Sequence, residues 1–236
     1  VNASGNISLT DSDDFGNIVE PTEGDIALIL HTSGSTGRPK GVPLSHRNLA
    51  VSAKNVAQSY KLVSTDVSLC VMPLFHIHGL VASTLAVFWS GGTVVMPSRF
   101  NPLSFWRIVR DHKVTWYSAV PTVHQLLLGR AESSSGRPVD AEGLRFIRSC
   151  SAPLAPEILR RLEEKFEVPV IEAYGMTEAA HQMTSNPLPP DERKPGSVGI
   201  GTGVEFRVVG DTGVTQEVGE VGEVVIRGAN VIDGYE

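Results

Sequence analysis

The sequence predicts an α/β fold with mostly parallel sheets and helices on both faces, followed by the start of a small antiparallel β subdomain. Three observations support this prediction. Short apolar runs alternate with helical patterns up to about residue 187. The connections between them are short, which suits right-handed crossovers between neighbouring parallel strands. Beyond residue 187 the helical patterns stop, and apolar runs are separated by glycine-rich turns that are typical of hairpins.

The predicted strands are short apolar runs that end at turn residues. The first, at residues 25–31, is apolar almost throughout and stops at a Gly/Ser/Thr cluster. We therefore expect a strand that is buried on both faces and feeds a loop. Further strands of the α/β region are expected at residues 67–72, 93–96, 114–118, 145–150 and 168–173.

The predicted helices begin at capping residues or prolines. Ser45 can cap a helix over residues 47–60, in which Leu49, Ala53 and Val56 recur at helical spacing. Pro102 and Pro121 can each occupy the first turn of a helix, because the missing N–H of proline costs nothing there. Further helices are expected at residues 80–89, 102–112, 121–128 and 156–166.

The last part of the chain has a different pattern. Runs at residues 204–209 and 223–227 predict antiparallel strands, with a turn at residues 210–213. We place a boundary in the polar, proline-rich stretch 186–195. The expected organisation is a first α/β subdomain with a phosphate loop, a second with acyl and adenine pockets, and the start of a β-barrel-like subdomain. Their ranges are residues 1–65, 66–190 and 191–236.

Composition excludes several classes of protein. The chain has 236 residues, 41% of them hydrophobic, which is enough to form a sizeable core. With 20 basic and 26 acidic residues the formal net charge is −6, which disfavours a nucleic-acid partner. Cys70 and Cys150 form no CxxC pair, which argues against a disulfide scaffold or a zinc ribbon.

The apolar runs and the first residues of the chain indicate where in the cell the protein is expected. No apolar run reaches the length of about 18 residues that a membrane span needs, so no span is expected. The first ten residues contain no basic patch followed by an apolar run, so we expect no signal peptide there. Both ends look cut, and we expect a piece of a longer intracellular protein from the cytosol or the peroxisome, of undetermined oligomeric state.

The most informative segment is the loop after the first predicted strand, residues 32–41 (TSGSTGRPKG). Its glycines let the backbone approach a ligand, so that successive N–H groups can point at phosphate oxygens. The hydroxyls add neutral donors, and Lys40 adds a positive charge. A Walker A loop is excluded, because its second glycine would fall at Pro39. A merely flexible Gly/Ser loop is the alternative.

Four motifs together resemble the adenylate-forming superfamily of acyl-CoA synthetases, luciferases and peptide-synthetase adenylation domains. They occur in the family's order across nearly the whole chain. They are TSGSTGRPKG at residues 32–41, PLFHIHG at 73–79, YGMTE at 174–178, and GEVVIRG at 222–228 followed by Gly234 and Tyr235. The strings RSCSAPLAP, EAYGMTEAAHQMTSNPLPP and KPGSVG are similar to those of plant and fungal oxalate–CoA ligases.

The resemblance implies a reaction and its site. A carboxylate attacks the α-phosphorus of ATP, pyrophosphate leaves, and coenzyme A displaces AMP from the acyl-adenylate. Lys40, Thr177 and Glu178 would be catalytic, with Glu178 as the Mg²⁺ ligand. Without the motif, Glu178 would be read as an ordinary solvated glutamate and Tyr174 as a core aromatic. The matching nucleotide-binding positions are Thr32, Ser33, Gly34, Ser35, Thr36, Gly37, Lys40, Ser151, Ala152, Pro153, Glu172, Ala173, Tyr174 and Thr177.

The implied acyl pocket departs from the commoner pattern. Cys150 and Ser151 stand where many relatives have two glycines, so their side chains should shorten the pocket. His76 and His181 are expected to face the same space as Ser151, and these polar groups suit a small and anionic acid such as oxalate. The pair of His76 and His78 could instead be core histidines or bind a metal, but no matching cluster of cysteines or carboxylates accompanies them.

Other readings remain open. The catalytic lysine of the family lies in a C-terminal domain beyond Glu236, so this chain alone is expected to be a poor catalyst. The acid could be a medium- or long-chain acid or a coumarate-type acid. The acceptor could be a carrier-protein thiol, or the adenylate could be oxidised as in luciferases. A non-catalytic AMP- or ATP-binding module and a scaffold protein are further alternatives.

Overall fold

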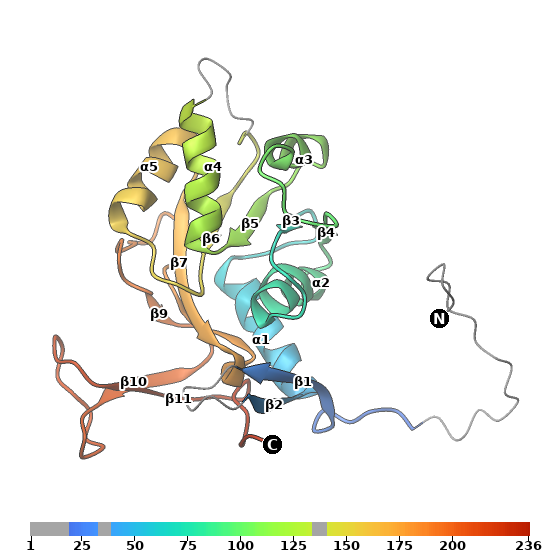
Figure 1. The fold of residues 1–236 in the computed structure, drawn as a ribbon. Coiled ribbons are helices and arrows are strands. Elements are labelled where there is room, and N and C mark those ends of the chain that lie inside the picture. The colour runs from blue at the N-terminus through green and yellow to red at the C-terminus, as the bar shows by residue number, and fades with distance from the viewer. Residues whose placement is uncertain (1–18, 33–38, 134–140) are drawn as a thin grey trace, which may run out of the picture.

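The computed structural model describes residues 19–32, 39–133 and 141–236 (Figure 1). Its strands form a seven-stranded sheet of order β4-β3-β5-β6-β7-β8-β9 and two antiparallel pairs, β1-β2 and β10-β11. The strands are β1 (Ile26–Thr32), β2 (Lys40–Ser45), β3 (Val67–Cys70), β4 (Thr93–Val95), β5 (Trp116–Ala119), β6 (Phe146–Ser149), β7 (Val170–Met176), β8 (His181–Ser185), β9 (Ile200–Gly201), β10 (Glu205–Val209) and β11 (Glu223–Arg227).

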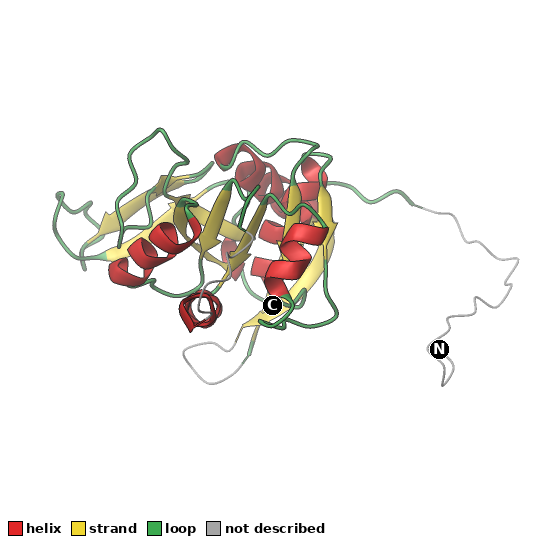
Figure 2. Ribbon diagram, turned by 90° about the horizontal axis from the view of Figure 1, so that it is seen from above, coloured by secondary structure: helices red, strands yellow, loops and turns green. Residues whose placement is uncertain are grey.

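The large sheet is parallel from β4 to β7 and antiparallel at β8 and β9. Helices flank its strands (Figure 2). The α-helices are α1 (His46–Ser59), α2 (Ala86–Trp89), α3 (Phe105–Asp111), α4 (Pro121–Ser133) and α5 (Pro156–Phe166); a π-helix η1 spans His78–Leu85 and a 3₁₀-helix η2 spans Thr177–Ala179.

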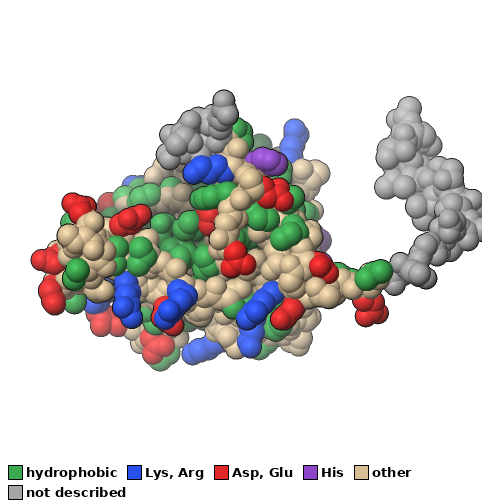
Figure 3. Space-filling model, turned by 90° about the horizontal axis from the view of Figure 1, so that it is seen from below, with side chains coloured by type: hydrophobic (Ala, Val, Ile, Leu, Met, Phe, Trp, Pro, Cys, Tyr) green, Lys and Arg blue, Asp and Glu red, His purple; other side chains and the backbone are tan. Residues whose placement is uncertain are grey.

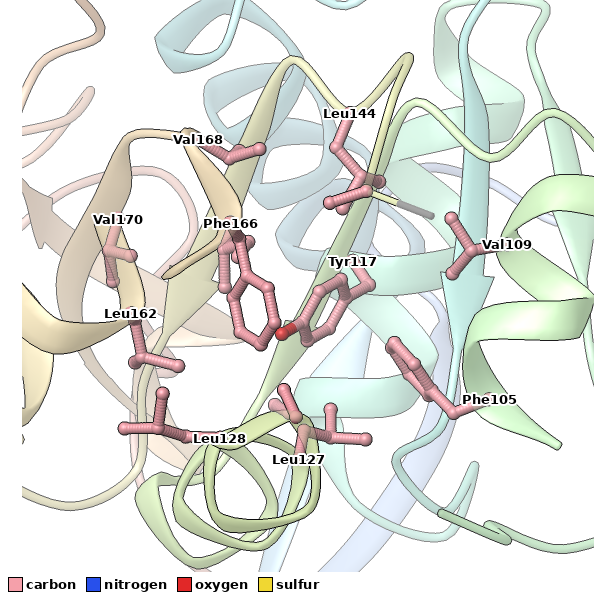
Figure 4. Close-up of a cluster of buried hydrophobic side chains, with 14 of the residues drawn as sticks. Phe105, Val109, Tyr117, Leu127, Leu128, Leu144, Leu162, Phe166, Val168 and Val170 are labelled. Carbon is pink, nitrogen blue, oxygen red and sulfur yellow. The ribbon is translucent and has the colours of Figure 1, made fainter. Parts of the chain in front are cut away.

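Alternate residues of the central strands enter two different cores, as a strand covered on both faces requires. Tyr117 of β5 and Ile147 of β6 pack with α3, α4 and α5, in a cluster that includes Phe105, Leu127 and Leu162 (Figure 4). Their neighbours Trp116 and Phe146 face the opposite side and pack with Tyr60 and with residues of α1 and α2. The predicted α/β class with helices on both faces is confirmed.

Several predicted boundaries are also confirmed. Helix α5 covers residues 156–166 with Pro156 in its first turn, and β11 covers residues 223–227. Ser45 is the N-cap of α1: its Oγ accepts from the N–H of Asn48 at 3.1 Å, and the Asn48 side chain accepts from the Ser45 N–H at 3.0 Å. This reciprocal capping box fixes where β2 ends and α1 begins.

The first predicted strand is present, but the prediction that it is buried on both faces was wrong. Residues 25–31 lie almost wholly in β1, yet β1 belongs to the antiparallel pair with β2 and not to the large parallel sheet. Leu28 and Leu30 pack on a core that includes Val42 and Leu44, whereas Ile26 is 51% and Ile29 is 41% exposed. Strand β2 was not predicted, because its sequence KGVPLS contains both glycine and proline.

The helix predicted at residues 80–89 begins earlier and is irregular. Its first eight residues form the π-helix η1, which starts at His78, and α2 follows directly.

In the part of the chain that the structure describes, no helix is both long and apolar enough to cross a membrane. Seen from below, apolar side chains gather in the middle of the face and charged side chains surround them (Figure 3).

Candidate active site

A cavity of about 320 Å³ opens beside the C-terminal part of β6 and β7. Ligands of parallel α/β sheets bind at this edge, where side chains of neighbouring strands converge. The cavity is lined by Ser149, Ser151, Ala152, Pro153, Leu154, Glu172, Ala173, Tyr174, Gly175, Gly196 and Val198.

All the residues that the sequence assigned to the adenine lie in this wall. Ser151, Ala152 and Pro153 follow β6, and Glu172, Ala173 and Tyr174 belong to β7. Strands β6 and β7 are parallel neighbours, which explains why two segments about twenty residues apart in sequence meet here. The structure thus brings these residues together, and their contact with adenine remains a prediction.

Two of these side chains have distinct surroundings. The Glu172 carboxylate is buried and accepts a hydrogen bond from the Gly196 N–H at 2.9 Å. Burial raises the pKa of Glu172, and the bond from Gly196 opposes that shift. Tyr174 is 40% exposed, which leaves its ring available for stacking against a planar base.

Two of the residues predicted to act at the phosphates, Lys40 and Glu178, meet at a second point, at Tyr235. The Lys40 Nζ lies 4.7 Å from the centre of the Tyr235 ring, and the Tyr235 hydroxyl donates to Glu178 Oε1 at 2.7 Å. Thr177 and Glu178 begin η2, directly after β7. Thr32 pairs with Lys40 across β1 and β2, so both ends of the phosphate loop are fixed. The predicted residues Ser33, Gly34, Ser35, Thr36 and Gly37 lie outside the described residues.

The structure brings together two of the three residues that the sequence assigned to the acyl pocket, Ser151 and His181. His76 is exposed, and its ring packs on that of Phe75 at 4.7 Å. His78 is buried instead: its Nδ1 lies 3.0 Å from Ser151 Oγ, and its ring centre lies 5.3 Å from that of His181. The structure therefore joins Ser151 and His181 through His78, and it does not bring His76 to this cluster.

Both buried histidines are neutral near neutral pH. Burial lowers the pKa of His78 and that of His181 well below the ordinary histidine value, and the nearby Arg148 guanidinium lowers both further. Neutral imidazoles have one donor and one acceptor nitrogen each. His78 and His181 can therefore each donate one hydrogen bond and accept another.

Comparison with known proteins identifies the family of the chain. Residues 4–236 match the family model described as "AMP-binding enzyme". The chain belongs to the AMP-binding enzyme family. It is 49% identical to the oxalate–CoA ligase of Arabidopsis thaliana over 98% of this chain and 46% of that protein. It is also 49% identical to the oxalate–CoA ligase of Saccharomyces cerevisiae, over 89% of this chain and 38% of that protein.

Two solved structures have a closely similar fold. The ATP-bound crystal structure of MatB from Rhodopseudomonas palustris matches with a TM-score of 0.82 and 33% identity, over 92% of this chain and 42% of that one. A malonyl-CoA ligase with methylmalonyl-CoA and AMP bound matches with a TM-score of 0.81 and 33% identity, over 93% of this chain and 47% of that one. The chain spans less than half the length of the curated relatives named above.

The donor set of this AMP-binding chain fits a magnesium ion held mainly by phosphates. In the described residues no three His, Cys, Asp or Glu side chains are grouped so as to hold a metal on their own. Mg²⁺ bound to ATP keeps phosphate and water ligands and needs only one or two protein carboxylates. The half-buried Glu178 carboxylate, beside the Lys40 and Tyr235 pair, can supply one of them.

Sequence reasoning missed Arg148 and Ser118, which lie within hydrogen-bond distance of the buried histidines His78 and His181. Arg148 is fully buried in β6 and donates to the Tyr60 hydroxyl at 2.8 Å, to Ser118 Oγ at 2.9 Å and to Gln182 Oε1 at 2.9 Å. An arginine inside the apolar run RFIRS was the available signal, because a charge in a covered strand needs an explanation.

Proposed function

We propose that the protein carrying this chain is an AMP-forming acid–CoA ligase for a small acid with a second anionic group, with oxalate as the first candidate. One observation carries the proposal. Ser151 both lines the cavity of the adenine-assigned residues and contacts the buried, polar cluster of His78 and His181. The nucleotide site therefore adjoins an acyl site that is closed by polar groups.

The reaction needs positioning and charge stabilisation more than a protein nucleophile. The acid's carboxylate oxygen forms a bond to the α-phosphorus of ATP while the bond to pyrophosphate breaks. The thiol of CoA then attacks the acyl carbon, a C–S bond forms and AMP leaves. Lys40 would offset negative charge on the phosphates, Thr177 would donate to them, and Glu178 would help to hold Mg²⁺.

The choice of acid rests on the chemistry of the closed end and on the relatives. A fatty acid needs an apolar tunnel, whereas His78, His181 and Arg148 are buried polar groups behind Ser151. Relatives at 49% and 43% identity are named for oxalate and for sulfoacetate, two small acids with a second anionic group. The chemistry of the closed end and the names of the relatives both support a small dianion, and the relative at 49% identity favours oxalate.

An aromatic or acyl-chain acid is the second candidate. It is favoured by relatives at 34% to 36% identity, among them feruloyl-CoA synthases and fungal acyl-CoA synthetases. A non-catalytic nucleotide-binding module is a third, and the presence of Lys40 and Glu178 at one point argues against it. Because ATP and CoA are intracellular, we expect the protein in the cytosol or the peroxisome.

ATP–pyrophosphate exchange by the whole protein tests the proposal. The acids are oxalate, malonate, sulfoacetate, acetate, octanoate and coumarate. We expect oxalate to stimulate exchange most, and octanoate and coumarate to give none. Exchange driven best by coumarate or octanoate would contradict the proposed acid, and no exchange with any acid would favour the nucleotide-binding module.

A further inference from the structure

Arg148 is a buried positive charge that no carboxylate of the described residues neutralises. Its side chain is fully inaccessible to solvent, and none of the ion pairs formed by the described residues includes it. Three residues earlier, Arg145 is paired with Asp66 at 2.6 Å and is partly exposed, as is usual for an arginine. A buried charge without a counter-ion is costly to fold, so its retention requires a reason other than stability.

The hydrogen bonds around Arg148 have only one consistent direction. A guanidinium can only donate, and Nη1 faces both Ser118 Oγ at 2.9 Å and His78 Nε2 at 3.4 Å. His78 Nε2 must therefore be an acceptor, and Ser118 donates its proton to it across 2.6 Å. The proton of the neutral His78 ring then lies on Nδ1, which donates to Ser151 Oγ at 3.0 Å.

This direction leaves the proton of Ser151 free to point away from His78. Ser151 is exposed and lines the cavity, and its φ of 72° places it in the left-handed region that side chains other than glycine rarely adopt. A hydroxyl held as a donor at the surface of a pocket suits an anionic oxygen and not a methyl group. His181 has the same orientation, because Arg148 Nη2 lies 3.4 Å from its Nε2.

We infer that Arg148 is a positioning residue that selects acids with a second anionic group, by fixing Ser151 as a hydrogen-bond donor through Ser118 and His78. The buried charge also places a positive potential behind the closed end of the acyl pocket. Arg148 need not touch the acid. The inference rests on the proposed function, since it assigns the preference for a dianion to a residue of the same site.

The test compares oxalate with acetate, which has the same number of carbons and lacks the second carboxylate. ATP–pyrophosphate exchange is measured on the whole protein for wild type and for R148M, R148K and S118A. R148M removes the charge at similar length. R148K keeps the charge and is the more conservative substitution, so it is the variant that should disturb folding least. S118A keeps the charge but removes the link to His78. R145M is the matched control, because it removes an arginine of the same segment that lies outside this chain of hydrogen bonds.

We expect R148M to lower kcat/KM for oxalate by about 100-fold and to change that for acetate by about threefold at most. S118A should lower the oxalate-to-acetate ratio by about tenfold, and R148K should keep the ratio within about tenfold of wild type. R145M should leave the ratio unchanged. The Kd for ATP, measured in parallel, reports whether each variant is folded.

Two results would overturn the inference while leaving the proposed function in place. In the first, R148M lowers oxalate and acetate activity equally, which would mean a structural role alone. In the second, S118A leaves the ratio of wild type unchanged. If wild type prefers malonate or sulfoacetate to oxalate, the proposed acid is wrong, and the same variants test Arg148 with the preferred dianion. A wild type that prefers acetate would contradict both.

Discussion

Gly175 lies where the cavity wall meets strand β8, and it offers a sharp test of how the site is built. It pairs with Gln182 at an irregular point of the β7–β8 register. A Cβ at this position would lie 1.8 Å from the His181 carbonyl oxygen, and the backbone would have to open by at least about 1.2 Å to reach the shortest tolerable contact of 3.0 Å. Because the clash is with backbone atoms, no side-chain rotation can relieve it.

Gly175→Ala should therefore lower the free energy of unfolding by about 3 kcal/mol, the upper part of the range for overpacking. It should also displace His181 and reduce oxalate-dependent exchange more than ATP binding. Urea unfolding of the whole protein followed by tryptophan fluorescence measures the first effect. The control is Gly129→Ala in helix α4, where an added Cβ meets nothing within 4 Å and should stabilise by about 1 kcal/mol. A G175A protein within about 0.5 kcal/mol of wild type, judged against overpacking costs, would refute the reasoning.

Three further predictions follow from other parts of the structure. Glu178→Gln should lower Mg²⁺-dependent exchange at least about 100-fold and leave the metal-free Kd for ATP within about threefold; equal losses in both would contradict a metal role. Ser45→Ala should cost about 1 kcal/mol of stability with unchanged KM values, and an unchanged urea midpoint would contradict the capping argument. Burial lowers the pKa of His124 from 6.5 to about 4, so its contribution to stability is lost as pH falls from about 6.5 to 4, by about 1.4 kcal/mol per pH unit. His124→Gln should reduce the slope of the stability–pH curve in that range by up to about 1.4 kcal/mol per pH unit, while the buried His78 and His181 still contribute to it, and an unchanged slope would contradict the prediction.

The elements that could be predicted from sequence are those fixed by local chemistry. Helix α5 has a proline in its first turn and a regular apolar face, and α1 has a serine that caps its own backbone. Such signals act within a few residues, so the boundaries follow without knowledge of the tertiary structure. The same holds for β11, a short apolar run bounded by glycines.

The elements that escaped prediction depend on partners far away in the chain. Strand β8 has the polar sequence HQMTS, and all five of its residues are buried. Gln182 bonds to the Tyr60 hydroxyl at 2.9 Å and to Arg148 at 2.9 Å, so its burial is compensated by a network that sequence spacing cannot reveal. Polar strands of this kind resemble loops until their partners are known.

The candidate site divides in the same way. Motif residues such as Lys40 and Glu178 could be identified from local strings, and the structure places them around one tyrosine ring. The burial of His78 beside Ser151 could not be predicted from the sequence, because it depends on where the π-helix η1 begins. An irregular helix rotates its residues in a way that regular periodicity does not predict.

Product formation by the whole protein tests the central claim most directly. Oxalate, ATP, Mg²⁺ and CoA are incubated with it, and the nucleotide and thioester products are identified by mass spectrometry. The account predicts oxalyl-CoA together with AMP and pyrophosphate in equal amounts, and no thioester from octanoate. Release of ADP, or a thioester formed from octanoate or coumarate but not from oxalate, would contradict it.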